Sequence, residues 1–191
     1  MKNHKTKCAL AVLFSLVLSS IFLVPALRAD TVMLSFSYGY LFPADSGYKE
    51  VYGSKVMVPE FKLGFRVISD VYIYGMFSTL SKNGTTPELN EPAHSKQQFM
   101  GGGLAYFPSV ARNLKIFIGA GVASATYEEE AMDIKVSGNK LGFLMEAGLY
   151  LRFKAVLFGL NGSYCAASDT YEGVDFKIGG TRASAVLGFI F

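Results

Sequence analysis

Six charged residues stand among apolar neighbours in this 191-residue chain, and they have the clearest potential for chemistry: Glu60, Lys62, Arg66, Glu146, Arg152 and Arg182. At the two-residue period of a β-strand, each points away from the bulky apolar residues beside it. Acids and bases that share an enclosed space form ion pairs, and removing one partner of a buried pair costs about 3–5 kcal/mol because the other charge is left unpaired. The six residues therefore predict an interior charge network that fills and rigidifies the protein, with solute gating as the alternative.

Catalytic chemistry has weaker support in the sequence. A nucleophile needs a base such as histidine within hydrogen-bond reach, and after residue 29 the chain has one histidine, His94, beside Ser95. Both lie in a polar stretch that we expect to be a long loop after the third strand. Adjacent side chains of an extended segment point apart, so we predict a surface histidine and no enzymatic activity.

Metal, cofactor and phosphate sites are not expected either. Acidic residues gather at 128–133 and 169–175, but without the alternating Asp/Asn register and turn glycine of a calcium loop. The run Gly101–Gly103 lacks the Lys-Ser/Thr that follows in a phosphate-binding loop, so a structural role in strand curvature is the better interpretation. Cys165 is the only cysteine after residue 29, which gives no disulfide and no metal-ligand spacing.

The elements that position the six charges are eight segments of alternating hydrophobicity. They cover residues 31–42, 58–67, 71–80, 97–107, 114–127, 140–153, 155–165 and 181–191. In six of them one face is bulky and apolar while the other carries glycine, serine, asparagine and the charges. The inward face of the third and fourth segments stays open.

The distribution of side chains favours a membrane barrel over a water-soluble sandwich. Arg or Lys facing lipid near the middle of a membrane costs about 2–4 kcal/mol, whereas an interior can pair or hydrate the charge. Aromatic residues also gather near the segment ends, as in interfacial belts: Tyr40, Phe42 and Tyr164 at one end, and Phe65, Tyr106, Phe153 and Phe191 at the other. The sequence predicts an all-β fold, an eight-stranded antiparallel transmembrane β-barrel.

The connections predict the orientation of this barrel. Those after the second, fourth and sixth segments are short, while those after the first, third, fifth and seventh are long and polar. Short turns face the periplasm and long loops the outside in barrels of this kind. Four extracellular loops are therefore expected, with both chain ends on the periplasmic side.

The first 29 residues have the pattern of a cleavable signal peptide. Lys2, Lys5 and Lys7 precede an apolar run, residues 9–27, that ends in small residues, and cleavage after Ala26 or Ala29 fits, with Ala29 preferred. An uncleaved membrane helix is the alternative. We therefore expect a signal peptide at 1–29 and one barrel domain at 30–191. Removal of the leader takes away four of the 18 basic residues and none of the 15 acidic ones, so nothing suggests a nucleic-acid partner.

The chain resembles the small outer-membrane β-barrel proteins of the OmpA and OmpX type. The resemblance rests on the leader, GYLFPAD at 39–45, NLKIFIGAGVASATYEE at 113–129, and GGTRASAVLGFIF at 179–191. It implies the outer membrane of a Gram-negative-type bacterium, with the lipid bilayer and lipopolysaccharide as surroundings, and a monomer. The terminal strand with Phe189 and Phe191 resembles the signal by which the barrel assembly machinery recognises its substrates.

These motifs are architectural, so the resemblance implies no shared substrate. We predict a structural or surface-interaction role in which the barrel anchors four extracellular loops. The alternative is a narrow conduit for small or hydrophobic solutes, which would require a gap through an interior that eight strands leave just wide enough for side chains to fill.

Overall fold

The computed structural model describes residues 30–87, 89–132, 134–171 and 173–191. Within them the elements are β1 (Val32–Pro43), α2 (Ser46–Tyr52), β2 (Val56–Ile68), β3 (Val71–Thr85), β4 (Pro92–Tyr106), β5 (Ser109–Ala111), β6 (Leu114–Ala131), β7 (Ile134–Phe153), β8 (Val156–Tyr171) and β9 (Val174–Ile190). The predicted signal peptide lies outside the described residues and stays a prediction. None of the described helices is long and apolar enough to cross a membrane.

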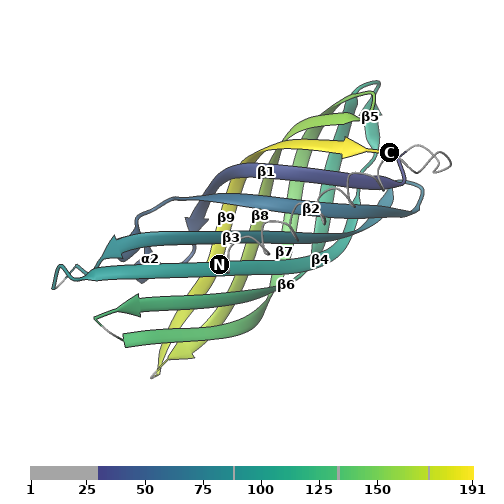
Figure 1. The fold of residues 1–191 in the computed structure, drawn as a ribbon. Helices are drawn as coiled ribbons and strands as arrows, with labels where there is room; N and C mark the ends of the chain where they lie inside the picture. Colours follow the sequence, from purple (N-terminus) through teal and green to yellow (C-terminus); the bar gives the residue numbers. More distant parts are fainter. Residues whose placement is uncertain (1–29, 88, 133, 172) are drawn as a thin grey trace, which may run out of the picture.

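The strands form a closed antiparallel barrel (Figure 1). Its wall has eight strands, because β5 is a three-residue strand that pairs only with the start of β6. β4 pairs with β6, and β1 pairs with both β2 and β9. Val32 and Phe191 exchange backbone hydrogen bonds of 3.0 and 2.9 Å beside this β1–β9 seam. Closure pairs the backbone N–H and C=O groups at the strand edges, as a bilayer requires. It also confirms the predicted eight-stranded fold.

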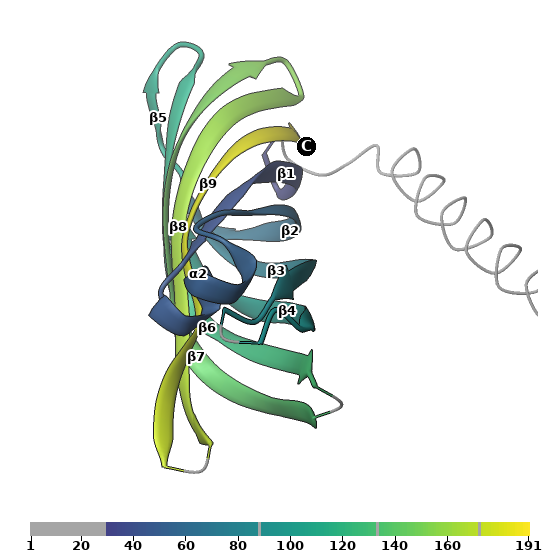
Figure 2. The ribbon, with the colours of Figure 1, turned by 90° about the vertical axis from the view of Figure 1, so that its left-hand side faces the viewer.

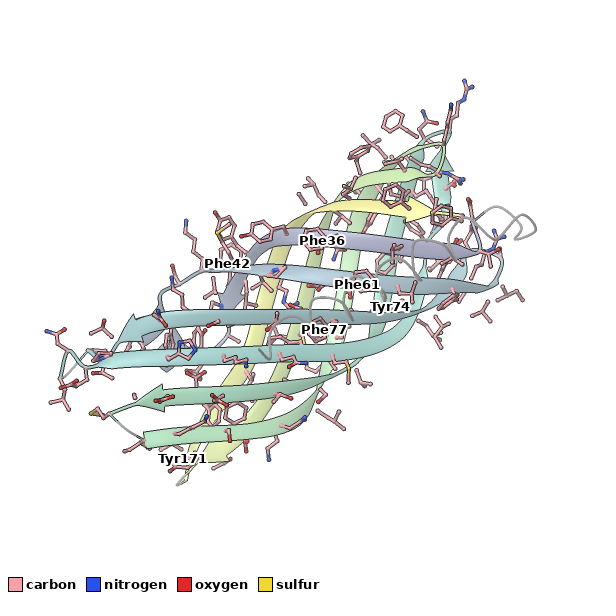
Figure 3. All side chains as sticks on the ribbon, viewed as in Figure 1. Phe36, Phe42, Phe61, Tyr74, Phe77 and Tyr171 are labelled. Carbon is pink, nitrogen blue, oxygen red and sulfur yellow. The ribbon has the colours of Figure 1, made fainter. Side chains whose placement is uncertain are left out.

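An apolar belt surrounds the barrel. Phe36, Phe61 and Phe77 project outward from β1, β2 and β3, while Tyr74 is buried inside (Figure 3). The other six predicted segments turn the apolar faces expected for them outward, although Phe117 and Tyr150 of the fifth and sixth segments are buried inside. For β3 and β4, whose inward face the sequence left open, Tyr72, Tyr74, Met76, Ser95, Gln97 and Phe99 face the interior. A continuous apolar exterior with charges inside suits lipid surroundings.

Three of the four predicted extracellular loops are instead continuations of the strands. The β3–β4, β6–β7 and β8–β9 hairpins stay paired as far as Thr85 with Pro92, Ala131 with Ile134, and Tyr171 with Val174. The prediction of loops is wrong here because these polar stretches lack a lipid-facing side and so resemble loops in sequence. Cross-strand pairing stabilises them instead. One such contact is the 2.8 Å ion pair between Lys135 and Glu128.

The connection after β1 folds into α2, which lies across the outer mouth of the barrel (Figure 2). Asp45 caps the helix by accepting a 2.9 Å hydrogen bond from the Tyr48 backbone N–H, and Gly53 ends it at a φ of 92°. Gly84 of β3 lies directly beneath, since an added Cβ would be 2.3 Å from the Val51 carbonyl oxygen. The glycine thereby lets the helix contact the strand.

The outer part of the barrel wall is split. Pairing between β7 and β8 ends at Phe143 and Ala166, although both strands continue outward. Beyond that point the β6–β7 and β8–β9 hairpins diverge, as Figure 2 shows. The split creates a space between the hairpins on the interior side of the outer mouth.

Two features of the structure favour glycine at position 179. We therefore expect Gly179→Ala to destabilise the barrel clearly more than Gly173→Ala. Both have positive φ, 91° and 81°, which costs a residue with a Cβ about 1–3 kcal/mol. An added Cβ at Gly179 would also be 2.2 Å from the Cys165 carbonyl oxygen, whereas at Gly173 it would meet nothing within 4 Å. Urea unfolding in detergent, followed by far-UV circular dichroism, measures the difference; equal midpoints would contradict this account.

Candidate functional site

Four of the six predicted charges meet in the middle of the barrel. Lys62 of β2 donates a hydrogen bond to Glu146 of β7 and lies 3.5 Å from Glu60. Arg182 of β9 donates to Glu60 over 3.1 Å. Asn161 of β8 also donates to Glu146, over 3.3 Å. Each of these side chains is at most 6% exposed, so the pairs are desolvated and depend on one another. We name these five residues the central cluster.

Aromatic rings stack against the two cations of the central cluster. The Lys62 ammonium lies 4.7 Å from the Phe117 ring centre and 5.5 Å from that of Tyr74. The Arg182 guanidinium lies 4.6 Å from the Phe99 ring centre. The negative faces of these rings stabilise desolvated cations, so the cluster is held by packing as well as by charge.

The other two predicted charges, Arg66 and Arg152, lie at the end of the barrel with the short turns, which we expected to face the periplasm. Arg152 pairs with Asp30 at 2.5 Å, and Lys115 lies 4.0 Å from the same carboxylate. Arg66 stands opposite Tyr72 in the β2–β3 ladder, close to the inner turn. The expected single network is thus divided between two levels of the barrel. Lys115 is buried here and extends the charged set beyond the six residues singled out from the sequence.

A layer of aromatic side chains fills the interior between these two charged levels. Phe107 contacts Tyr72, Phe117 and Tyr150 with ring-centre distances of 5.9, 5.7 and 5.3 Å. Small and polar residues were expected on this face, so the aromatic layer was not predicted. The sequence did contain a signal for this layer. Phe117 lies two residues after Lys115, and Tyr150 lies four residues after Glu146, so each ring points inward like the charge before it. The aromatic layer and the central cluster thus occupy successive levels of the barrel interior.

His94 and Ser95 are on β4 and not in a loop, which corrects the prediction of their place. As expected for neighbours in a strand, they point apart. The His94 ring hydrogen-bonds outside the barrel to Asn83, at 2.7 Å. Ser95 faces the interior and donates a 2.7 Å hydrogen bond to Glu129. Ser95 is therefore not a partner of His94, whose Nε2 lies 3.4 Å from the Ser81 hydroxyl oxygen instead.

The two diverging outer hairpins are bridged by Asp169 of β8. Its carboxylate accepts a 2.7 Å hydrogen bond from Tyr127 of β6 and pairs with Lys140 of β7 at 3.0 Å. The Tyr127 hydrogen bond, helped by Lys140, holds the pKa of Asp169 below its ordinary value. The bridge keeps the space between the hairpins at a defined width.

No group of three or more His, Cys, Asp or Glu side chains within the described ranges can hold a metal ion. Asp133 and Glu172, two members of the acidic stretches noted in the sequence, lie outside these ranges. The remaining acids at the outer end mostly have local partners, such as Thr170 for Asp175 at 2.5 Å.

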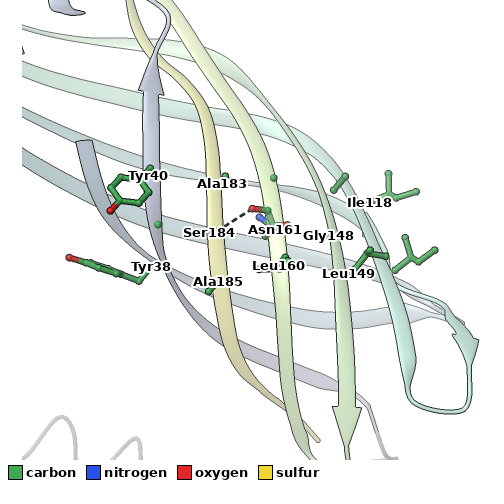
Figure 4. A pocket seen from close by; sticks show the side chains of 14 residues that line it. Tyr38, Tyr40, Ile118, Gly148, Leu149, Leu160, Asn161, Ala183, Ser184 and Ala185 are labelled. Atoms are coloured by element: carbon green, nitrogen blue, oxygen red, sulfur yellow. Dashed lines mark hydrogen bonds between the residues drawn. The ribbon is translucent and has the colours of Figure 1, made fainter. Parts of the chain in front are cut away.

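A hollow of about 740 Å³ lies on the exterior, where Ala147, Gly162 and Ala183 stand side by side on β7, β8 and β9 (Figure 4). Tyr38 and Tyr40 border it on one side and Leu149 on the other. Its lining is almost wholly apolar and belongs to the lipid-facing belt. Lipid chains are therefore its natural neighbours, and no polar group there suggests chemistry.

The terminal aromatics also belong to this belt. Phe189 and Phe191 stack with 6.4 Å between ring centres and an angle of 10° between planes, and both face outward. Their side chains contribute nothing to the interior.

Solved structures resemble this barrel, although no family model and no curated protein matches the chain. Neisserial surface protein A (NspA) aligns with a TM-score of 0.62 and 13% identity, over 86% of this chain and 100% of that one. Ail, the attachment invasion locus protein of Yersinia pestis, was solved in complex with the heparin analogue sucrose octasulfate. It aligns with a TM-score of 0.57 and 12% identity, over the same shares. At such identities the likeness establishes the fold.

Both neighbours are small barrels with the same overall plan. A bilayer imposes three features on such a chain: closure by eight strands, charges held inside and an apolar belt outside. The protein is therefore an integral outer-membrane β-barrel with the fold of the small OmpA and OmpX type.

Proposed function

We propose that this protein is a closed, non-enzymatic outer-membrane barrel that presents its outer hairpins and α2 for interaction outside the cell. The observation that carries the proposal is the filled interior. The central cluster and the aromatic layer follow one another along the barrel axis, so a solute would have to break ion pairs and displace packed rings. Such an interior supports rigidity rather than conduction.

The length of the strands supports an external role. β6 and β7 contain 18 and 20 residues. At a rise of about 3.3 Å per residue and a tilt of about 40°, such strands extend roughly 45–50 Å along the barrel axis, against an apolar band of about 25 Å. The excess is at the outer end, where the hairpins leave the membrane and become available to partners.

The charge of the outer hairpins bears on the kind of partner. Acidic and basic residues are both present there and form ion pairs, as in Lys135–Glu128 and Lys140–Asp169. Ail binds a heparin analogue, but this mixed surface does not favour a polyanion as the partner here. Lipopolysaccharide surrounds the barrel in this proposal, the assembly machinery inserts it through the terminal strand, and the protein acts as a monomer.

Planar-bilayer recording on the refolded barrel tests the closed interior. We expect heat-modifiable migration on a detergent gel, which reports a folded barrel, and no discrete conductance steps. A known porin in the same bilayer is the positive control. Discrete steps from the folded protein would overturn the closed-barrel proposal and favour the narrow conduit.

A further inference from the structure

The outer mouth holds a cavity of about 250 Å³ between α2 and the barrel wall. Two aromatic pairs form its walls. The Tyr48 and Tyr52 rings of α2 are 4.6 Å apart, and Tyr127 of β6 meets Phe176 of β9 edge to face at 5.3 Å. Glu129 of β6 also lines the cavity, which gives it a carboxylate among aromatic rings.

Glu129 lacks a cationic partner. No Lys, Arg or His nitrogen among the described residues comes within 4 Å of its carboxylate, although Glu128 beside it pairs with Lys135. Its hydrogen bonds come from neutral donors: Ser95 at 2.7 Å and Gln97 at 3.5 Å, both to Oε1, and the Tyr52 hydroxyl. Burial raises the pKa of Glu129, and these hydrogen bonds oppose the rise only in part.

Gln97 adds a second unmatched group. Its side chain is 4% exposed and lines the same cavity, and its carbonyl Oε1 has no hydrogen-bond partner among the described residues. A buried acceptor without a donor costs about 1–3 kcal/mol. The cavity thus combines an acceptor that lacks a donor with a carboxylate that lacks a cation.

A second hollow, of about 360 Å³, adjoins the first and shares Tyr127, Phe176 and Glu129 with it. It occupies the split between the β6–β7 and β8–β9 hairpins, and its remaining lining is Val136, Tyr171 and Val174. This part is mainly apolar. The two hollows together therefore have a polar, acidic end and an apolar end.

We propose that this outer-mouth pocket binds a primary ammonium compound with an apolar body. The ammonium group fits between Glu129, which supplies the opposite charge, and Gln97 Oε1, which accepts an N–H. Aromatic rings stabilise a cation near their faces, and the apolar body lies against Val136 and Val174. Asp45 and Lys177 also line the cavity, with Lys177 exposed, and His94 faces outward. The opposite charges of Asp45 and Lys177 offset each other, so the charge of Glu129 still favours a cation.

The proposal goes beyond the proposed function, because it rests on the geometry of the outer mouth and not on whether the interior conducts. A barrel that binds the amine and also conducts would contradict the closed interior alone. A barrel that does neither would contradict the pocket alone.

Calorimetric titration of the folded protein in an uncharged maltoside detergent tests the pocket, with hexylammonium as the probe and 1-hexanol as its neutral counterpart. We expect hexanol to bind at least tenfold more weakly. Glu129→Gln should weaken hexylammonium binding by at least tenfold, and the matched control Glu128→Gln should leave it within twofold of the native value. Equal binding of amine and alcohol would overturn the proposal, and this comparison uses the native protein, so it holds even if Glu129→Gln fails to fold.

The role of Gln97 has its own readout. Gln97→Met should weaken binding of hexylammonium several-fold but leave binding of trimethylhexylammonium, which has no N–H, nearly unchanged. Equal losses for both probes would show that Gln97 acts only by shaping the cavity. A native protein that binds trimethylhexylammonium more tightly than hexylammonium would overturn the assignment of a primary ammonium.

Discussion

Replacing Lys62 with methionine should lower the free energy of unfolding by about 3–5 kcal/mol, because two buried carboxylates lose their shared cation. Methionine keeps most of the side-chain length but donates no hydrogen bond. Glu146 would lose the ammonium that it binds directly, and Glu60 would keep only Arg182. The chain has no tryptophan, so urea unfolding in vesicles is best followed by far-UV circular dichroism and heat-modifiable gel migration.

Two further variants show whether this loss comes from the buried pair. Adding Glu146→Gln to Lys62→Met removes the unpaired charge and should restore part of the stability, a non-additivity typical of directly coupled residues. Lys135→Met is the matched control, because its pair with Glu128 is about half exposed and solvent screening leaves such a pair little effect on stability. Similar losses for Lys62→Met and Lys135→Met would refute a desolvated central cluster.

Phe191→Ser should strongly reduce the amount of barrel in the outer membrane while changing the stability of the folded barrel much less. The Phe191 backbone joins Val32 whatever its side chain is, and that side chain faces lipid. Loss of part of one aromatic contact costs only about 1–2 kcal/mol. Cell fractionation measures the amount of barrel in the outer membrane, and refolding of purified protein into vesicles measures the stability of the folded barrel. Comparing the two measurements separates the effects.

Phe153→Ser provides the control for this experiment. Phe153 is also an exposed aromatic at the short-turn end of the belt, but it ends β7 and not the chain. We expect it to reach the outer membrane at near-native levels. If both variants assemble equally well, or if Phe191→Ser fails to refold in vitro, the terminal residue acts through stability and is not an assembly signal.

Local pattern predicted the barrel because a strand in a membrane meets different surroundings on its two faces. Phe61 and Lys62 are neighbours, yet one is 46% exposed on the outside and the other 3% exposed within. That difference follows from the two-residue period and the cost of a charge in lipid. The same pattern failed at the outer hairpins, where both faces are wet and alternation of hydrophobicity disappears.

The pocket at the outer mouth illustrates a different limit. Glu129 is one of three consecutive glutamates, and nothing in that run distinguishes it from Glu128 or Glu130. Strand register turns Glu129 inward, and α2 covers it from a distant part of the chain. Only the packed structure reveals that this carboxylate is partly buried beside aromatic rings.

The sequence by itself determined the number of strands in the barrel wall, the face on which most side chains lie and the separation of charge from lipid, since each depends on near neighbours in the chain. Tertiary structure decided which charges meet. Lys62 and Glu146 are 84 positions apart, and the stagger of the strands around the closed barrel brings them together while it sends Arg66 and Arg152 to the end with the short turns. That stagger is a property of the whole closed sheet, so no single strand contains the information to predict it.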